Sequence, residues 1–136
     1  MTDTPAPAAK KGTILLTDDD KFLLDMYGMK FTQSGYTVET CLSGSEALGI
    51  LRGGFQPDVI LFDLTMPELD GLSFLKAIAD EHLAQNAIKI ALTNQSNDSE
   101  KAKAAELGAT RYIVKASMIP SEVVNTVNEE LAKHHA

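Results

Sequence analysis

Four apolar stretches of the sequence each run into side chains that can do chemistry. The first, ILL at residues 14–16, passes through Thr17 into three consecutive acids, and the others also end in polar residues. The polar residues concerned are Asp18, Asp19, Asp20, Asp63, Thr93 and Lys115. Carboxylates held close together repel one another and need either protons or a cation. Oxygen ligands of this type suit Mg²⁺, which favours one or two carboxylates plus a phosphoryl oxygen.

The ammonium group of Lys115 and the hydroxyl group of Thr93 extend this chemistry. A metal ion, an ammonium group and a hydroxyl group together complement the oxygens of a phosphoryl group. A carboxylate can itself attack phosphorus and form an aspartyl phosphate. These residues therefore predict a Mg²⁺-dependent phosphoryl site, provided that the fold brings them together.

The order of elements predicts how the chain positions these residues. Apolar stretches alternate with segments of helical period, and the predicted strands are residues 13–17, 36–42, 58–62, 88–93 and 111–115. Several are nearly continuous apolar runs, as expected of parallel strands covered on both faces. We therefore expect an α/β fold of the (βα)5 type with a doubly wound parallel sheet. Ligands of such sheets bind beyond the carboxyl ends of the strands, which is where the polar residues would converge.

Local patterns give further expectations for two helices. Asp20 is expected to cap the first helix. Phe22, Met26 and Met29 share one face of that helix, and we expect Met26 and Met29 to lie in the core. The helix around residues 99–107, SEKAKAAEL, is small and polar, so it should be among the less stable elements.

Composition limits the class of protein. The 136 residues are 44% hydrophobic and 23% charged, which fits one globular domain. The net charge of -7 argues against direct contact with nucleic acid, whose affinity comes mainly from lysine and arginine on phosphates. A single cysteine, with neither a long apolar run nor a leader, favours a cytoplasmic protein without membrane insertion. Residues 1–12 are expected to be a disordered tail, and residues 13–136 the domain.

Several motifs occur together and resemble the receiver domain of two-component response regulators, the CheY-like family. They are the pair Asp18-Asp19, D-x-x-M-P-x-x-D-G from Asp63 to Gly71, GSEAL at 44–48, LGA at 107–109 and YIVK at 112–115. The resemblance covers roughly residues 13–133. It implies a flavodoxin-like three-layer sandwich with strand order 2-1-3-4-5. It also implies a signalling switch of a phosphorelay rather than an enzyme.

The resemblance implies a role for each acid of the site. Asp63 would accept a phosphoryl group from a histidine kinase or a histidine phosphotransfer protein. Asp19 and Asp63 would bind Mg²⁺ directly, and Asp18 would act largely through water. The backbone carbonyl group of Thr65 would complete the protein ligands.

The resemblance also implies how phosphorylation is read out. Thr93 and Lys115 would contact the phosphoryl group, and Tyr112 would report the switch through its rotamer. The loop after Thr93 and the helix that follows would change, which would alter the binding of a downstream protein target.

Ala116 stands after Lys115 where receiver domains usually have proline. A cis peptide bond costs about 0.5–1 kcal/mol before proline but about 2.5–4 kcal/mol before other residues. We therefore expect a trans bond and a loop re-routed through Ser117, which would cap the last helix ahead of Pro120.

Two alternative functions use the same residues. Haloacid-dehalogenase-like phosphatases also form an aspartyl phosphate with Mg²⁺, and their D-x-D motif is formally present, with Asp18 as nucleophile and Asp20 as acid/base. The acidic pair that those enzymes need after the lysine is missing, and Asp63 would have no role. A receiver that binds partners without phosphorylation is the second alternative, although its five key groups are all present.

Overall fold

A computed structural model describes residues 12–135, and these form a single five-stranded parallel sheet with helices on both faces. The strands are β1 (Gly12–Thr17), β2 (Tyr36–Cys41), β3 (Val59–Asp63), β4 (Ile88–Thr93) and β5 (Arg111–Val114). The helices are α2 (Lys21–Gln33), α3 (Gly44–Arg52), α4 (Gly71–Asp80), α5 (Asp98–Glu106) and α6 (Pro120–His135), and a 3-10 turn, η1, spans Lys115–Ser117. The strand order is β2-β1-β3-β4-β5, which confirms the predicted fold.

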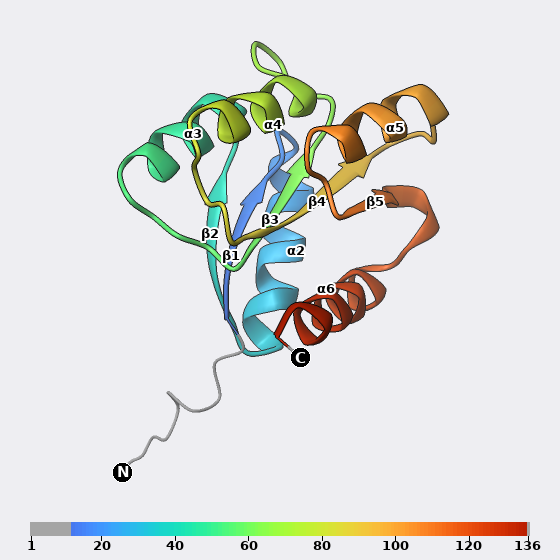
Figure 1. Cartoon of the computed structure of the whole chain (residues 1–136). Coiled ribbons are helices and arrows are strands. Elements are labelled where there is room, and N and C mark those ends of the chain that lie inside the picture. The colour runs from blue at the N-terminus through green and yellow to red at the C-terminus, as the bar shows by residue number, and fades with distance from the viewer. Residues whose placement is uncertain (1–11, 136) are drawn as a thin grey trace.

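The sheet separates two apolar cores. Helices α2 and α6 cover one face, and α3, α4 and α5 cover the other (Figure 1). Side chains of β1 alternate between the cores: Ile14 and Leu16 pack with α2 and α6, whereas Leu15 packs with the other three helices. All residues of the central strand β3 are buried. Because both faces are covered, the strands show the continuous apolar runs from which they were predicted.

The carboxyl ends of β1 and β3 lie side by side at the point where the strand order reverses. β1 pairs with β2 on one edge and with β3 on the other, and Thr17 lies opposite Phe62 of β3. In an open α/β sheet this reversal creates the ligand-binding crevice. The residues that follow these two strands are therefore the ones that the fold presents to a ligand.

Side-chain caps start four of the helices that follow the strands. Asp20 caps α2, as predicted, by accepting hydrogen bonds from the backbone N–H groups of Phe22 and Leu23. Ser43 caps α3, Asp70 caps α4 and Asn97 caps α5, each by accepting from one backbone N–H group of the first turn. Because each cap accepts orphan N–H groups of the first turn, the helix starts are fixed close to the site.

The prediction that Met26 and Met29 of α2 lie in the core is wrong. Phe22 is 75% exposed and Met29 is 61% exposed, and Met26 is only half-buried. The face that packs on the sheet consists of Leu24, Tyr27, Gly28 and Phe31. This helix carries two apolar faces, so periodicity alone does not say which one meets the sheet.

Two boundary predictions need correction. Residues 1–11 of the predicted tail lie outside the described residues, and Gly12 belongs to β1.

The bond between Lys115 and Ala116 is trans, as predicted. Ser117, however, lies in η1 and does not cap α6, which begins with N–H groups bonded to the carbonyl group of Ile119.

The described part of the chain also bears on the membrane prediction. None of its helices combines the length and the apolar character needed to cross a membrane.

Candidate functional site

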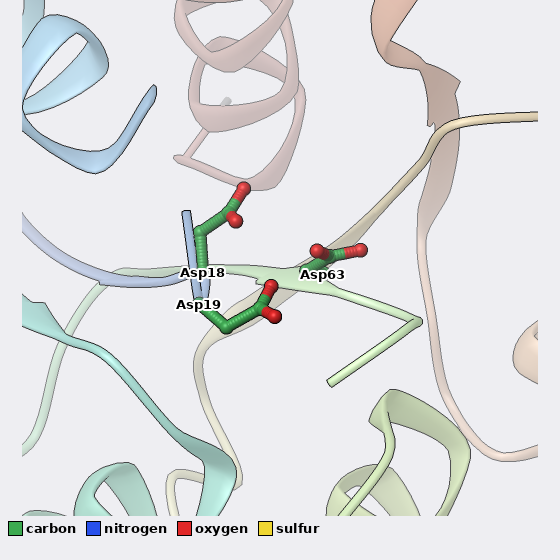
Figure 2. A group of neighbouring side chains, drawn as sticks. All are labelled: Asp18, Asp19 and Asp63. Atoms are coloured by element: carbon green, nitrogen blue, oxygen red, sulfur yellow. The ribbon is translucent and has the colours of Figure 1, made fainter. Parts of the chain in front are cut away.

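Three of the predicted acids lie together at the carboxyl edge of the sheet. Carboxylate oxygens of Asp18, Asp19 and Asp63 all lie within 4.8 Å of one another. Figure 2 shows the three side chains rising from the adjacent ends of β1 and β3. Asp18 and Asp63 are buried, and Asp19 is exposed. Asp20, by contrast, faces the first turn of α2 as its cap and is not a member of this cluster.

Lys115 joins the two buried acids. Its Nζ lies 2.8 Å from Oδ2 of Asp18 and 3.2 Å from Oδ2 of Asp63. The Lys115 side chain is only 9% exposed, so water screens these ion pairs weakly. The lysine directly follows β5, and the strand therefore delivers its charge across the sheet edge to the ends of β1 and β3.

Backbone N–H groups fix the other oxygen of each buried carboxylate. The N–H group of Asp20 donates to Oδ1 of Asp18 at 2.9 Å, and that of Thr65 donates to Oδ1 of Asp63 at 3.1 Å. The N–H group of Asp18 in turn donates to the carbonyl oxygen of Cys41 at the end of β2. Both carboxylates are thus held by one backbone donor and one ammonium group, which restricts their orientation.

Burial governs the electrostatics of Asp63. It raises the pKa of Asp63 from 3.8 to about 6, the charge of Asp18 adds to this rise, and the Thr65 N–H group and Lys115 only partly oppose it. For Lys115, burial lowers the pKa, but the hydrogen bonds and charges of Asp18 and Asp63 outweigh burial and raise it above its usual value. Above pH 7 the site therefore contains an ionised Asp63 beside a protonated Lys115.

The donor set suits a hard divalent cation. Asp18, Asp19 and Asp63 bring three carboxylates to one point, and Lys115 is the one ammonium group that bonds to them within residues 12–135. The excess of negative charge favours a cation, and oxygen ligands without nitrogen or sulfur favour Mg²⁺ or Ca²⁺ over Zn²⁺. The acidic cluster can therefore bind a metal.

Thr93 and Tyr112 lie at the same edge, but their hydroxyl groups do not bond to Asp18, Asp19 or Asp63. Thr93 Oγ1 donates to the carbonyl oxygen of Gln95 at 3.1 Å. The Tyr112 hydroxyl oxygen lies 3.4 Å from the same carbonyl oxygen and 3.4 Å from a carboxylate oxygen of Glu100. It also accepts from the N–H group of Asn97. Thr93 is thus held by the loop between β4 and α5, and Tyr112 is held by that loop and by the first turn of α5.

Gly71 is a site residue whose role the sequence did not indicate. A Cβ atom at this position would lie 2.6 Å from Cα of Leu64 and 2.7 Å from the carbonyl oxygen of Asp63. The N–H group of Gly71 donates to the carbonyl oxygen of Leu64 at 2.9 Å. The start of α4 therefore packs directly on the backbone that carries Asp63, and only glycine fits there. Glycine costs stability within a helix, so its presence directly after Asp70 is a signal, though an unspecific one, of such a close approach.

Known proteins with similar sequences support the assignment of a family. The sequence model described as the response regulator receiver domain matches residues 14–128. The chain is 33% identical over 120 residues to response regulator SaeR of Staphylococcus epidermidis, covering 88% of this chain and 50% of SaeR. It is 31% identical over 126 residues to SaeR of Staphylococcus aureus, covering 90% of this chain and 53% of SaeR. The chain thus spans about half the length of these curated relatives.

Solved structures with the same fold agree with this assignment. A CheY-like receiver domain protein of Methanospirillum hungatei has a TM-score of 0.82 at 25% identity, covering 90% of this chain and 95% of that one. The chemotaxis response regulator CheY4 of Vibrio cholerae has a TM-score of 0.78 at 28% identity, covering 86% and 96%. The family match includes the acidic cluster and Lys115, so both the matched range and the geometry lead to one conclusion. The chain belongs to the response regulator receiver domain family, the signalling switches of two-component systems.

Proposed function

We propose that Asp63 accepts a phosphoryl group from the phosphohistidine of a histidine kinase or of a histidine phosphotransfer protein. One observation carries the proposal: the ammonium group of Lys115 bonds to Asp63 and Asp18 at once, at the crevice end of the sheet. A cation beside a carboxylate at this edge can hold an incoming phosphoryl oxygen while the carboxylate attacks. The family of the chain supports the same proposal.

The chemistry requires an ionised Asp63. One of its carboxylate oxygens forms a bond to phosphorus, the phosphorus–nitrogen bond of the phosphohistidine breaks, and its electron pair stays with the imidazole nitrogen. A pKa of about 6 leaves most Asp63 ionised at pH 7 and above. Lys115 keeps its proton throughout and stabilises the added negative charge.

Asp18, Asp19 and Asp63 would hold Mg²⁺, with the carbonyl group of Thr65 as a further ligand. When bound, Mg²⁺ neutralises charge on the carboxylates and on the phosphoryl oxygens. Without a cation, three carboxylates and one ammonium group would repel an anionic phosphoryl donor. The exposed Asp19 leaves the cluster open to solvent, from which the ion would enter.

The switch would start at the shared acceptor, the carbonyl oxygen of Gln95. A phosphoryl group on Asp63 offers new acceptor oxygens that compete with this carbonyl for the Thr93 hydroxyl group. Moving Thr93 would disturb the loop that also holds Tyr112. Helix α5 follows this loop and buries only Ala104, so its displacement costs little apolar contact. We propose that the downstream protein target reads the surface of α5, β5 and α6.

The phosphoryl donor would dock on α2 and the start of α6. Helix α2 starts two residues after Asp19, so Phe22 lies at the rim of the site with three quarters of its surface exposed. Ile119, also exposed, precedes α6, and a groove of about 280 Å³ between the two helices is lined in part by Met29 and Pro120. Exposed apolar residues that border a reactive site mark a protein contact. A donor bound here would present its phosphohistidine to Asp63 from the side on which α2 starts.

Labelling with acetyl phosphate and Mg²⁺ tests the proposed acceptor without a partner protein. The wild-type chain should gain one phosphoryl group by intact mass, and Asp63→Asn should gain none. Asp25→Asn, which changes an exposed acid paired with Lys21, is the control and should be labelled like the wild type. Equal labelling of Asp63→Asn and the wild type would contradict the proposal.

A further inference from the structure

A second cavity lies at the end of the sheet opposite to the acidic cluster. It has a volume of about 300 Å³ and lies between α4 and α5, near the start of β4. Its lining combines the apolar residues Ala79, Leu83 and Leu107, above the fully buried Leu75 and Ile78, with the polar side chains of His82 and Gln85. Lys89, the second residue of β4, brings an ammonium group to this apolar lining. A concave and largely apolar surface with a few polar groups, one of them charged, is the usual composition of a small-molecule site.

Lys89 has no acid as a partner within the described residues. Its Nζ donates to the carbonyl oxygens of Ala84 and Ala87, both at 3.2 Å. It makes no other hydrogen bond within residues 12–135. The neighbouring acids Asp80 and Glu81 pair instead with Lys76 and Arg52. An ammonium group has three donors, so one donor of Lys89 is left for a ligand. Burial lowers the pKa of Lys89, consistent with the lack of a compensating negative charge.

We propose that this cavity, the Lys89 groove, binds a small monocarboxylate with a short apolar tail. The carboxylate would pair with the Lys89 ammonium group, and the tail would lie against the accessible side chains of Ala79, Leu83 and Leu107. One ammonium group matches one carboxylate, and a lining without further lysine or arginine does not compensate a doubly charged phosphate. The volume is at the lower end of the range for ligand cavities, about 300–1,000 Å³, which suits a tail of a few carbons.

The Lys89 groove borders the end of α5, the helix that follows the proposed switch loop. Leu107 and Gly108, which follow α5, line the groove, and the loop before α5 holds Thr93 and Tyr112. A ligand would therefore contact one end of the helix whose other end carries the switch loop. Binding at the groove does not depend on phosphorylation of Asp63, so the two proposals can fail separately.

Hexanoate is a suitable probe, with the unphosphorylated 136-residue chain as the receptor. We expect its addition to shift the backbone amide NMR signals of Leu83, Leu107 and Gly108 in a saturable way. The pKa of Lys89, followed by the NMR signals of its side chain, should rise because a carboxylate stabilises the charged form. 1-Hexanol and hexylammonium have the same tail without the negative charge, and they should bind at least about tenfold more weakly.

Three variants separate binding from structure. Lys89→Met should weaken hexanoate binding by about tenfold or more, whereas Lys76→Met, at an exposed lysine of α4, should leave it unchanged. If Lys89→Met does not fold, Ala79→Leu is the test variant, because it narrows the groove and leaves the hydrogen bonds of Lys89 in place. It should also weaken hexanoate binding. Equal binding of hexanoate and hexylammonium, an unchanged affinity in either groove variant, or no saturable shift at all would overturn the proposal.

Discussion

Replacing Asp63 by asparagine should stabilise the metal-free protein at neutral pH, although it removes half of an ion pair. Asp63 is 2% exposed, and burial raises its pKa from 3.8 to about 6. The folded chain therefore binds this proton more tightly than the unfolded chain does. By linkage, the free energy of unfolding falls as the pH rises from about 4 to about 6, and it stays reduced above that range. Asparagine has the same shape and does not titrate, so the variant escapes this cost.

The magnitude follows from the two pKa values. A shift from 3.8 to about 6 corresponds to about 3 kcal/mol at pH 7.5, and about half of this cost is already present at pH 5. The substituted asparagine would still accept from the N–H group of Thr65, and Lys115 would keep its shorter ion pair with Asp18. The gain of Asp63→Asn should therefore be near 3 kcal/mol at pH 7.5 and about half of that at pH 5.

Urea unfolding in EDTA at pH 5, 6 and 7.5 measures this difference directly. Asp25→Asn is the matched control, because it neutralises an exposed acid, and it should change the free energy of unfolding by less than about 0.5 kcal/mol at each pH. Adding Mg²⁺ should reduce the advantage of Asp63→Asn, since the ion stabilises only the chain that retains the carboxylate. A variant that is less stable than the wild type at pH 7.5, or a gain that does not grow with pH, would show that the attraction of Lys115 outweighs burial.

Three other predictions test the site and its surroundings. Mg²⁺, followed by NMR titration, should bind about tenfold more weakly at pH 5 than at pH 7, because Asp63 must lose its proton. Asp19→Ala should weaken Mg²⁺ binding further, and an equal affinity of this variant and the wild type would exclude the proposed ligands. Thr17→Val should stabilise the fold by about 1–2 kcal/mol, since the Thr17 hydroxyl oxygen is the one buried side-chain nitrogen or oxygen atom without a hydrogen-bond partner among the described residues; a loss of stability would contradict this reasoning. Gly71→Ala should lower the free energy of unfolding by about 1–3 kcal/mol and slow acetyl phosphate labelling. Gly49→Ala is the control: its added Cβ atom has no neighbour within 4 Å, so it should be neutral or stabilising. Equal effects of the two variants would contradict the close approach at Gly71.

The sequence predicts the fold well because both faces of the sheet are covered. Continuous apolar runs and helical periods alternate along the chain, and each predicted strand agrees with the observed one to within a residue at either end. The cluster of Asp18, Asp19, Asp63 and Lys115 also follows from this order. In a parallel sheet all strand ends of one kind lie at one edge, so the last residue of each strand is placed by topology alone.

What the sequence does not predict depends on contacts between distant elements. Two apolar faces of α2 compete for the sheet, and packing with α6 decides for the face that includes Tyr27 and Phe31. The hydroxyl groups of Thr93 and Tyr112 turn to the carbonyl group of Gln95, and no local pattern indicates that acceptor. Lys89 lies within a predicted strand, and its bonds to a neighbouring turn appear only in three dimensions.

The buried charges of the site make the domain responsive. Asp63 is held in an environment that penalises its charge, and Lys115 relieves only part of that penalty. A stable core would not place an acid there, so the local cost is evidence of a functional requirement. The same cost means that a cation or a covalently attached phosphoryl group acts on a site that is not at its electrostatic optimum. In the proposed switch, the response would pass through Thr93 to α5, which buries only Ala104, so that a small change in free energy there would have a large effect on structure.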